Sequence, residues 1–143
     1  MDIAEGPKAE NSNARAFSRN RQSSGEPGSN RQRHLRRQAG SELSIIVPTY
    51  NERENIAELV RRLDDSLADC SWEVIFVDDD SPDGTSDLVR EIAQRDVRIR
   101  CVQRINRRGL ASACVEGILA SSAPYVAVID ADLQHDETLL PRM

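Results

Sequence analysis

Acidic residues are concentrated at two places where the sequence predicts the end of a strand. Asp130 and Asp132 follow the apolar run at residues 125–129, and the alternation of side chains along an extended chain places both carboxylates on one side. Residues 78–80, all aspartates, follow a second apolar run at residues 74–77. Carboxylates at this density repel one another unless a hard cation or basic groups neutralise them. Oxygen ligands favour Mg2+ or Mn2+, whose open positions accept substrate phosphates, so the two clusters predict a metal-assisted site for a nucleotide diphosphate.

Arginines and two other polar side chains could complete such a site. Arg104, Arg107 and Arg108 follow a third predicted strand, and guanidinium groups bind phosphate and carboxylate oxygens. Gln134 stands in the same segment as the second acidic pair and either completes the ligands of the cation or faces solvent. Tyr50 either stacks on a nucleotide base or packs against the helix that follows it.

Each acidic cluster also has an interpretation without function. Residues 78–80 could form a simple turn, with Asp83 or Thr85 capping the next helix. Asp130 and Asp132 could be a solvated strand end. A role for both clusters is nevertheless favoured, because two unrelated groups of carboxylates at the same edge of one sheet are a less common coincidence than either group alone.

The elements that would position these residues begin at residue 43, where short apolar runs alternate with segments of helical periodicity. Strands are expected at residues 43–47, 74–77, 97–101 and 125–129. Pro48 lacks a backbone donor and is expected to end the first strand. Asn51 and Glu54 form a capping-box-like pair that begins a helix ending near Asp69. Further helices are expected after the turn at residues 81–84 and after Gly109.

This order of elements favours an α/β fold with an open, mostly parallel sheet and helices on both faces, of the Rossmann-like nucleotide-binding kind. Residues 97–101 alternate apolar with charged side chains, so that strand is expected at an edge and the other three inside the sheet. Ligands bind beyond the carboxyl ends of the strands in such folds, and all the polar segments should therefore converge on one edge.

The first 41 residues differ in composition from the remainder of the 143-residue chain, which has room for one ordinary domain. Residues 1–40 contain eight Lys and Arg against four Asp and Glu, and only four large apolar side chains. This is too little to offset the entropy of folding, so we interpret residues 1–41 as a disordered basic polar tail and residues 42–143 as the folded domain. The tail could make peripheral contact with anionic lipid, and no nucleic acid partner is expected.

The sequence contains no signal for export or membrane spanning. No apolar run approaches the roughly 20 residues of a membrane-spanning helix, and the acidic, polar start is unlike a secretory signal. Cys70, Cys101 and Cys114 form no CxxC pair and leave an odd thiol, which favours a reducing compartment. We expect a cytoplasmic location, compatible with the cytoplasmic face of a membrane.

Four strings of the sequence resemble the inverting family-2 glycosyltransferases of GT-A fold, and most of all the dolichyl- and polyprenyl-phosphate mannosyltransferases among them. The strings are IVPTYNERENI at residues 46–56, VDDDSPDGT at 77–85, GLASACVEG at 109–117 and DADLQH at 130–135. Each string is weak alone, but their order and spacing are together specific. The resemblance implies metal-dependent transfer of a hexose to a polyprenyl or dolichyl phosphate, with the mannose of GDP-mannose expected first and a hexose from a UDP-sugar as the alternative.

The resemblance also implies roles for individual residues. The residues that would hold the nucleotide base and ribose are Pro48, Tyr50, Glu52, Val77 and Asp79. The catalytic DXD-type element would be Asp130, Ala131 and Asp132, with Asp132 and Gln134 on the Mg2+ or Mn2+. Many relatives have Gly or Asn at the position of Asp80. Because members of the family continue well beyond the DXD string, the resemblance covers a nucleotide-sugar-binding half that is truncated at its carboxyl end.

Three other interpretations stay open. A receiver-type phosphoacceptor domain also binds Mg2+ at an acidic pair, but that pair would follow the first strand of the domain. A dinucleotide-binding oxidoreductase would have G-x-G-x-x-G after the first strand, and residues 48–52 lack it. A catalytically inactive donor-binding fragment of the glycosyltransferase fold has the same site residues as the enzyme, so the sequence does not separate the two.

Overall fold

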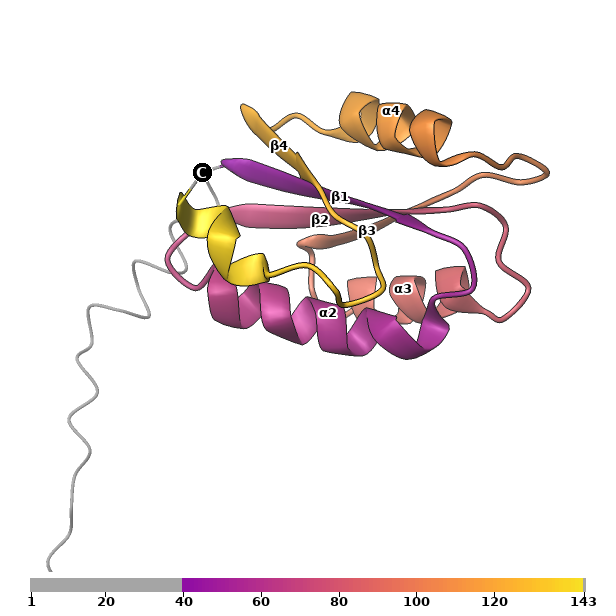
Figure 1. Ribbon diagram of the computed structural model, residues 1–143, viewed down its shortest axis with the longest axis horizontal. Coiled ribbons are helices and arrows are strands. Elements are labelled where there is room, and N and C mark those ends of the chain that lie inside the picture. Colours follow the sequence, from indigo (N-terminus) through magenta and orange to yellow (C-terminus); the bar gives the residue numbers. More distant parts are fainter. Residues whose placement is uncertain (1–39, 143) are drawn as a thin grey trace, which may run out of the picture.

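The computed structural model describes residues 40–142, which form one parallel sheet with helices on both faces (Figure 1). The strands are β1 (Leu43–Thr49), β2 (Trp72–Asp78), β3 (Ile99–Gln103) and β4 (Tyr125–Val128), in the order β3-β2-β1-β4. The helices are α2 (Arg53–Ser66), α3 (Thr85–Ala93), α4 (Leu110–Ala120) and the 3-10 helix η1 (Glu137–Arg142). The expected fold class is confirmed. The expected disordered tail lies outside the described residues, apart from its last two positions.

The two central strands are apolar on both faces. All seven residues of β2 are buried, and residues 45–47 of β1 have no exposed surface. The strands pair in register from Leu43 opposite Trp72 to Thr49 opposite Asp78. β3 lies at one edge of the sheet, which confirms the position predicted from its alternating apolar and charged side chains.

β4 lies at the other edge of the sheet that residues 40–142 form. The prediction that this strand lies inside the sheet is therefore wrong. It pairs with β1 from Tyr125 opposite Leu43 to Val128 opposite Ile46, and no described strand pairs with its other side. Tyr125 is accordingly 71% exposed. A continuous apolar run indicates a strand that suits burial on both faces, but it does not determine how many strands flank it.

β1 continues through Pro48 to Thr49, so the prediction that Pro48 ends the strand is also wrong. The carbonyl of Thr49 accepts a hydrogen bond from the N–H of Asp79, whereas the carbonyl of Ile46 accepts one from Ile129. Backbone groups therefore face β2 at odd-numbered residues of β1 and β4 at even-numbered ones. Pro48 faces the side on which β4 has already ended, and its missing donor leaves no gap in the ladder.

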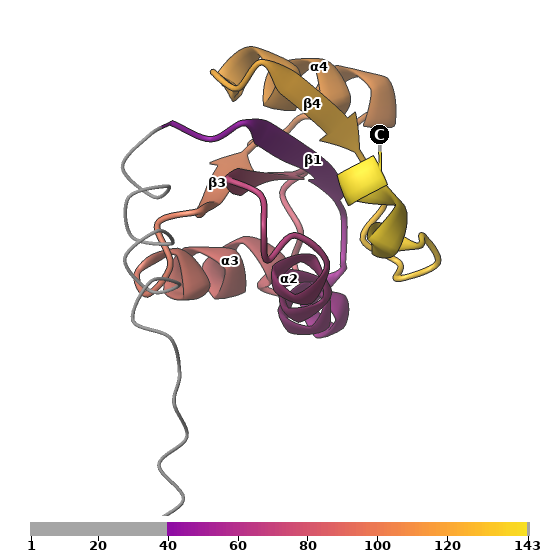
Figure 2. The same cartoon turned by 90° about the vertical axis from the view of Figure 1, so that its left-hand side faces the viewer.

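Two hydrophobic cores lie on opposite faces of the sheet. α2 and α3 cover one face and α4 covers the other (Figures 1 and 2). The larger core lies under α2 and α3 and contains Ile45, Val47, Ile56, Leu59, Leu63, Trp72, Val74, Phe76 and Val89. The smaller core lies under α4 and contains Ile46, Ile75, Val77 and Ala113. Burial of each Leu-sized or Ile-sized side chain contributes about 1.5 to 3 kcal/mol to folding.

α2 begins at Arg53, and the predicted capping box of Asn51 and Glu54 does not form. The N-cap residue is Glu52, without a side-chain cap. Asn51 has a φ of 60°, and its N–H donates to Ser81 Oγ at 2.9 Å. The turn between β2 and α3 therefore supplies the acceptor at the start of α2 in place of a local cap.

Small residues bring α4 close to the sheet. Gly117 and Ala113 are its buried residues, and a Cβ on Gly117 would lie 2.3 Å from Cγ2 of Ile46 and 3.0 Å from Cγ2 of Val77. The large apolar side chains of α4, such as Leu119, are exposed. No helix within residues 40–142 combines the length and the apolar character needed to cross a membrane.

Replacing Gly117 with alanine should lower the free energy of unfolding by about 1 to 3 kcal/mol, because the new methyl group overpacks the contact with Ile46. The loss should appear even though alanine has a helix propensity about 1 kcal/mol better than that of glycine. Urea unfolding followed by circular dichroism measures it. Ala111→Gly, at an exposed position of the same helix, calibrates the propensity effect alone. An unchanged or raised stability of the Gly117 variant would contradict the close packing.

Candidate functional site at the carboxyl ends of the strands

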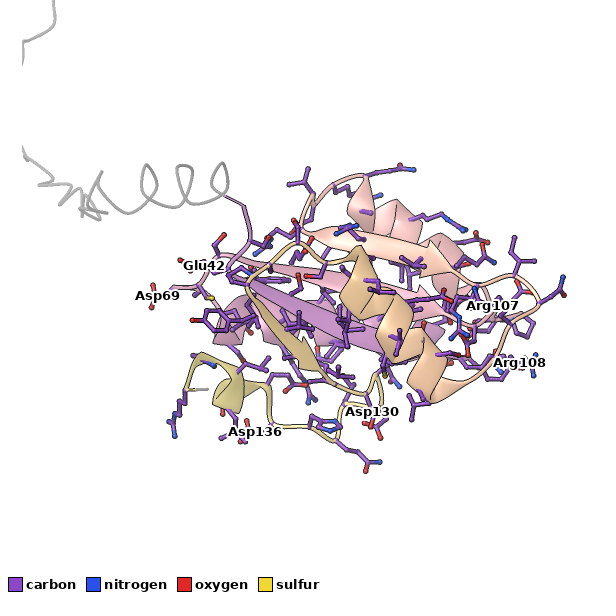
Figure 3. All side chains as sticks on the ribbon, turned by 90° about the horizontal axis from the view of Figure 1, so that it is seen from above. Glu42, Asp69, Arg107, Arg108, Asp130 and Asp136 are labelled. Atoms are coloured by element: carbon purple, nitrogen blue, oxygen red, sulfur yellow. The ribbon has the colours of Figure 1, made fainter. Side chains whose placement is uncertain are left out.

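The segments that follow the four strands all leave from one edge of the sheet, because the strands are parallel. Figure 3 shows Arg107 and Arg108, which follow β3, at the end of the molecule opposite Glu42 and Asp69, which precede β1 and β2. Asp130 lies two residues beyond the end of β4. The topology thus places on one edge the four polar segments that the sequence indicated.

Asp78 has a structural role in the turn after β2. Its carboxylate is fully buried and accepts hydrogen bonds from the hydroxyls of Thr49 at 3.2 Å and Ser81 at 2.5 Å, and from the N–H of Ser81 at 3.0 Å. Because these donors occupy both oxygens, Asp78 fixes the end of β2 against the end of β1. The interpretation as a turn is correct for this residue.

Asp79 is held by the segment that follows β3. Its Oδ2 accepts the N–H of Gly109 at 2.7 Å, and its Oδ1 lies 2.9 Å from Nη1 of Arg104. The side chain is only 10% exposed, and Oδ1 has no aligned hydrogen-bond donor among residues 40–142. Arg104 therefore compensates the charge of this oxygen through an ion pair.

Arg104 neutralises carboxylates of the protein. Its side chain is 2% exposed, it donates to the carbonyl of Gly109 at 3.1 Å and to Ser112 Oγ at 2.5 Å, and its Nε lies 3.5 Å from Glu116. Arg107 also pairs with Glu116. Basic groups therefore relieve the repulsion around Asp79, and the partners of Arg104 among the described residues are carboxylates of the protein.

Asp80 adopts the left-handed backbone conformation, with a φ of 58°. Glycine and asparagine adopt this conformation most readily. In this chain the cost is offset by side-chain hydrogen bonds: Asp80 Oδ1 accepts from Gln103 at 3.1 Å and Oδ2 lies 3.5 Å from the N–H of Asn106. Asp80 thus links the end of β2 to the end of β3.

Tyr50 is partly exposed and is not part of either hydrophobic core. The residue is 40% exposed, and the guanidinium of Arg108 lies over its ring at 4.3 Å from the centroid, an arrangement stabilised by the quadrupole of the ring. Glu52 accepts a hydrogen bond from Asn55 at 2.7 Å and lines a hollow of about 470 Å3 at the start of α2. Pro48 is half-buried, and Val77 is fully buried.

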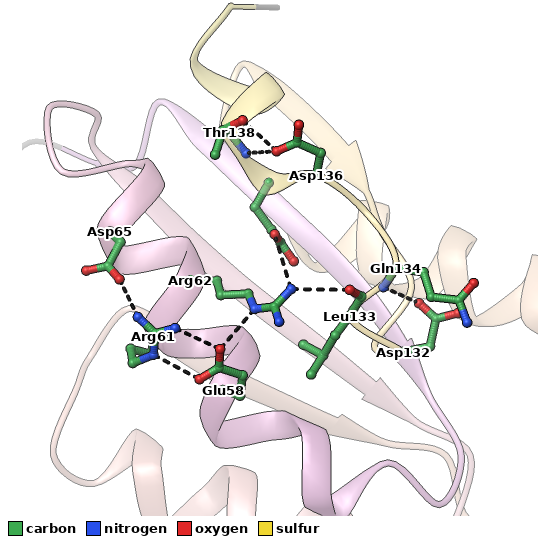
Figure 4. A network of polar contacts seen from close by, with 10 residues as sticks. Glu58, Arg61, Arg62, Asp65, Asp132, Leu133, Gln134, Asp136 and Thr138 are labelled. Atoms are coloured by element: carbon green, nitrogen blue, oxygen red, sulfur yellow. Dashed lines mark hydrogen bonds and ion pairs between the residues drawn. The ribbon is translucent and has the colours of Figure 1, made fainter.

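The acidic segment after β4 presents two exposed carboxylates. Asp130 and Asp132 are exposed and Ala131 between them is buried. Asp132 Oδ1 accepts the N–H of Gln134 at 3.0 Å (Figure 4), and the Asp130 side chain makes no hydrogen bond or ion pair with residues 40–142. The described residues contain no group of three acidic, His or Cys side chains placed to share a cation. A hard cation fits these oxygen donors only if a bound molecule supplies further ligands.

Two residues that position this edge were not predicted from the sequence as parts of the site. Arg62 of α2 donates to the carbonyl of Leu133 at 3.2 Å, within the acidic segment after β4. Asp83 accepts hydrogen bonds from Thr85 and from the N–H of Arg53. Burial raises the pKa of Asp83, but these hydrogen bonds outweigh it and lower the pKa below its ordinary value. The contacts of Arg62 with Leu133 and of Asp83 with Arg53 join residues 71 and 30 positions apart, and contacts over such separations leave no pattern in the sequence.

The structure is an open parallel α/β sheet with exposed carboxylates beyond β4 and a buried carboxylate beyond β2, at the edge where ligands bind in such folds. The chain belongs to glycosyl transferase family 2, whose sequence profile matches residues 44–143. The expected resemblance is therefore confirmed, and it decides against the receiver-type and oxidoreductase interpretations.

This chain is similar to only part of the length of each relative. A dolichol-phosphate mannosyltransferase of Pyrococcus furiosus is 40% identical over 101 residues, which are 71% of this chain and 28% of that protein. One of Saccharomyces cerevisiae is 38% identical over 105 residues, 71% of this chain and 39% of that protein. A mannosyltransferase of Pyrobaculum calidifontis in complex with GDP-Man and Mn2+ matches with a TM-score of 0.56 and 32% identity, over 65% of this chain and 28% of that one. The chain thus spans well under half the length of these relatives.

Proposed function

We propose that this chain is the donor-binding part of an inverting glycosyltransferase that transfers mannose from GDP-mannose to a polyprenyl or dolichyl phosphate with the help of Mg2+ or Mn2+. The observation that supports the proposal most directly is the pair of exposed carboxylates of Asp130 and Asp132, at the edge of the sheet where nucleotides bind. Relatives at 40% and 38% identity are dolichol-phosphate mannosyltransferases, which favours mannose and a lipid phosphate.

The nucleoside of the donor is assigned to the segments after β1 and β2. Asp79 supports this assignment by its position, because Gly109 and Arg104 hold its carboxylate at the end of β2, and its N–H donates to the carbonyl of Thr49 at the end of β1. Tyr50 and Glu52 follow β1 at the same edge, and Pro48 and Val77 lie opposite each other one residue before the ends of β1 and β2.

The diphosphate of the donor is assigned to the segment after β4. Asp132 and Gln134 would hold the cation, and Asp130 and the Ala131 backbone would border the ribose and phosphates. A bound Mg2+ or Mn2+ supplies the neutralisation that a departing diphosphate needs. The two carboxylates are too few to hold the cation alone, which is consistent with a cation that binds together with the donor.

The acceptor is assigned by its chemistry. A lipid phosphate has a second pKa of about 6 and reaches the site largely ionised near neutral pH, so it attacks without a general base. The acceptor lipid would bring the protein to the cytoplasmic face of a membrane. An inactive donor-binding fragment remains the alternative, because the chain covers only 28 to 39% of the mannosyltransferase relatives.

Isothermal titration calorimetry of the full chain with GDP, in the presence and absence of Mn2+, tests the donor site. We expect GDP to bind at least about tenfold more tightly with Mn2+ than without it, because the cation bridges the diphosphate and the carboxylates. UDP serves as the matched ligand, and preference for UDP would move the donor to another hexose. A folded chain that binds neither nucleotide with Mn2+ would reject the donor site.

A transfer assay with radiolabelled GDP-mannose and polyprenyl phosphate then separates the enzyme from the inactive fragment. Radiolabel that moves into the organic phase shows transfer, and nucleotide binding without such movement shows a fragment that only binds the donor.

A further inference from the structure

Arg62 of α2 contacts the segment that follows β4 at two residues, Leu133 and Glu137 (Figure 4). Its Nη1 donates to the carbonyl of Leu133 at 3.2 Å and lies 4.0 Å from Oε2 of Glu137. On its other side its Nε donates to Glu58 at 3.0 Å. The guanidinium therefore joins the middle of α2 to both ends of the stretch from Leu133 to Glu137, although Arg62 lies 71 residues before Leu133.

The contact with Leu133 reaches Asp132 through one peptide group. The carbonyl of Leu133 and the N–H of Gln134 belong to the same peptide unit, which is planar and rigid. The carbonyl accepts from Arg62, and the N–H donates to Asp132 Oδ1 at 3.0 Å. Rotation of this peptide group would break both hydrogen bonds at once, so Arg62 restrains the donor that orients the Asp132 carboxylate.

Other contacts also restrain the segment from Leu133 to Glu137. Leu133 has a φ of 62°, which is unfavourable for leucine, and its side chain packs against the core under α2. The Glu137 side chain is only 7% exposed, and its Oε1 is buried without a hydrogen-bond partner among residues 40–142. Arg62 lies beside this buried acid, so it compensates a buried charge in the same segment in which it holds the strained backbone at Leu133.

We propose that Arg62 is a positioning residue for Asp132: through the peptide group between Leu133 and Gln134 it fixes the direction of the Asp132 carboxylate toward the cation and the diphosphate. This inference rests on the proposed function for the identity of the ligand. Removal of Arg62 should therefore weaken the metal-dependent part of donor binding and leave the nucleoside contacts after β1 and β2 intact.

The chain offers a matched control in the adjacent residue. Arg61 has the same side chain on the same helix and also pairs with Glu58, but its other partner is Asp65, and it makes no contact with the acidic segment. A general effect of lost charge on α2 would appear equally in Arg61→Ala and Arg62→Ala. Arg62→Lys keeps the charge and one donor, so it should restore part of the effect.

Two measurements on the full chain test the proposal. The first is the hydrogen exchange rate of the Gln134 amide without any ligand, which should rise at least about tenfold in Arg62→Ala and stay unchanged in Arg61→Ala. The second is the affinity for Mn2+ in the presence of GDP, followed by electron paramagnetic resonance. It should fall about 10- to 100-fold in Arg62→Ala, as expected for removal of an outer contact that orients a ligand, and to an intermediate value in Arg62→Lys.

The outcomes separate this inference from the proposed function. An unchanged Gln134 amide in a folded Arg62→Ala variant, or an equal loss of Mn2+ affinity in Arg61→Ala, would overturn the positioning role. If Arg62→Ala does not fold, Arg62→Lys carries the same comparison. If the unaltered chain binds no Mn2+ with GDP, the proposed function fails, while the amide measurement still decides whether Arg62 restrains the peptide that orients Asp132.

Discussion

Asp132→Ala is expected to abolish nearly all of the gain in GDP affinity that Mn2+ confers, about tenfold or more, because it removes a ligand of the cation and not merely an outer contact. Asp132 is exposed beyond β4, and its carboxylate accepts only the N–H of Gln134 from the described residues. The loss should therefore fall on ligand binding. Calorimetry with GDP, with and without Mn2+, measures it, and metal-free binding should change little.

Two further variants separate the charge of Asp132 from its hydrogen bond. Asp132→Asn keeps an acceptor for the Gln134 N–H and the size of the side chain, so it should preserve the loop but lose the metal dependence almost as completely. Asp136→Asn changes an exposed acid in the same segment that bonds only with Thr138, and it should bind GDP with Mn2+ as the parent does. Retained metal dependence in Asp132→Ala would place the cation elsewhere.

The sequence predicted the sheet well because its strands carry strong local signals. The apolar runs located β1, β2 and β4, and the alternation of Arg98, Ile99 and Arg100 located β3 at an edge. The errors concern features that depend on neighbours. Pro48 can lie within β1 because β4 ends before it, so no hydrogen bond from the nitrogen of Pro48 is missing. β4 is an edge strand because no described strand pairs with its other side.

The sequence predicted which segments form the site, but it did not predict the contacts between individual residues. Parallel strands bring their carboxyl ends together, so the edge followed from the order of elements. Which carboxylates are used in the turn and which are exposed could not be deduced, because Asp78 and Asp79 differ only in their tertiary partners. The contact of Arg62 with Leu133 likewise depends on how α2 packs beside the segment after β4.

Arg104→Met should destabilise the fold more than any other single change in the site. The methionine keeps the length and apolar stem of the side chain but leaves Asp79, 10% exposed, without its cation. Breaking a buried pair in this way costs about 3 to 5 kcal/mol, and the partial exposure of Glu116 favours the lower end of that range. Urea unfolding by circular dichroism measures the loss.

Arg107→Met provides the matched control, because Arg107 also pairs with Glu116 but is 58% exposed. Exposed ion pairs contribute about 0 to 1 kcal/mol, so this variant should remain close to the parent. Equal losses in the two variants would show that Glu116, and not Asp79, is the partner that matters.

The double variant Arg104→Met with Asp79→Asn identifies the source of the loss. If the cost of Arg104→Met comes mainly from an uncompensated charge on Asp79, neutralising that charge should recover about half of it, giving a coupling energy of about 1.5 to 2.5 kcal/mol. Asparagine retains an acceptor for the N–H of Gly109, which Asp79 Oδ2 now accepts. Purely additive losses would instead assign the role of Arg104 to its contacts with Gly109 and Ser112, which hold the start of α4 against the edge where the donor is proposed to bind.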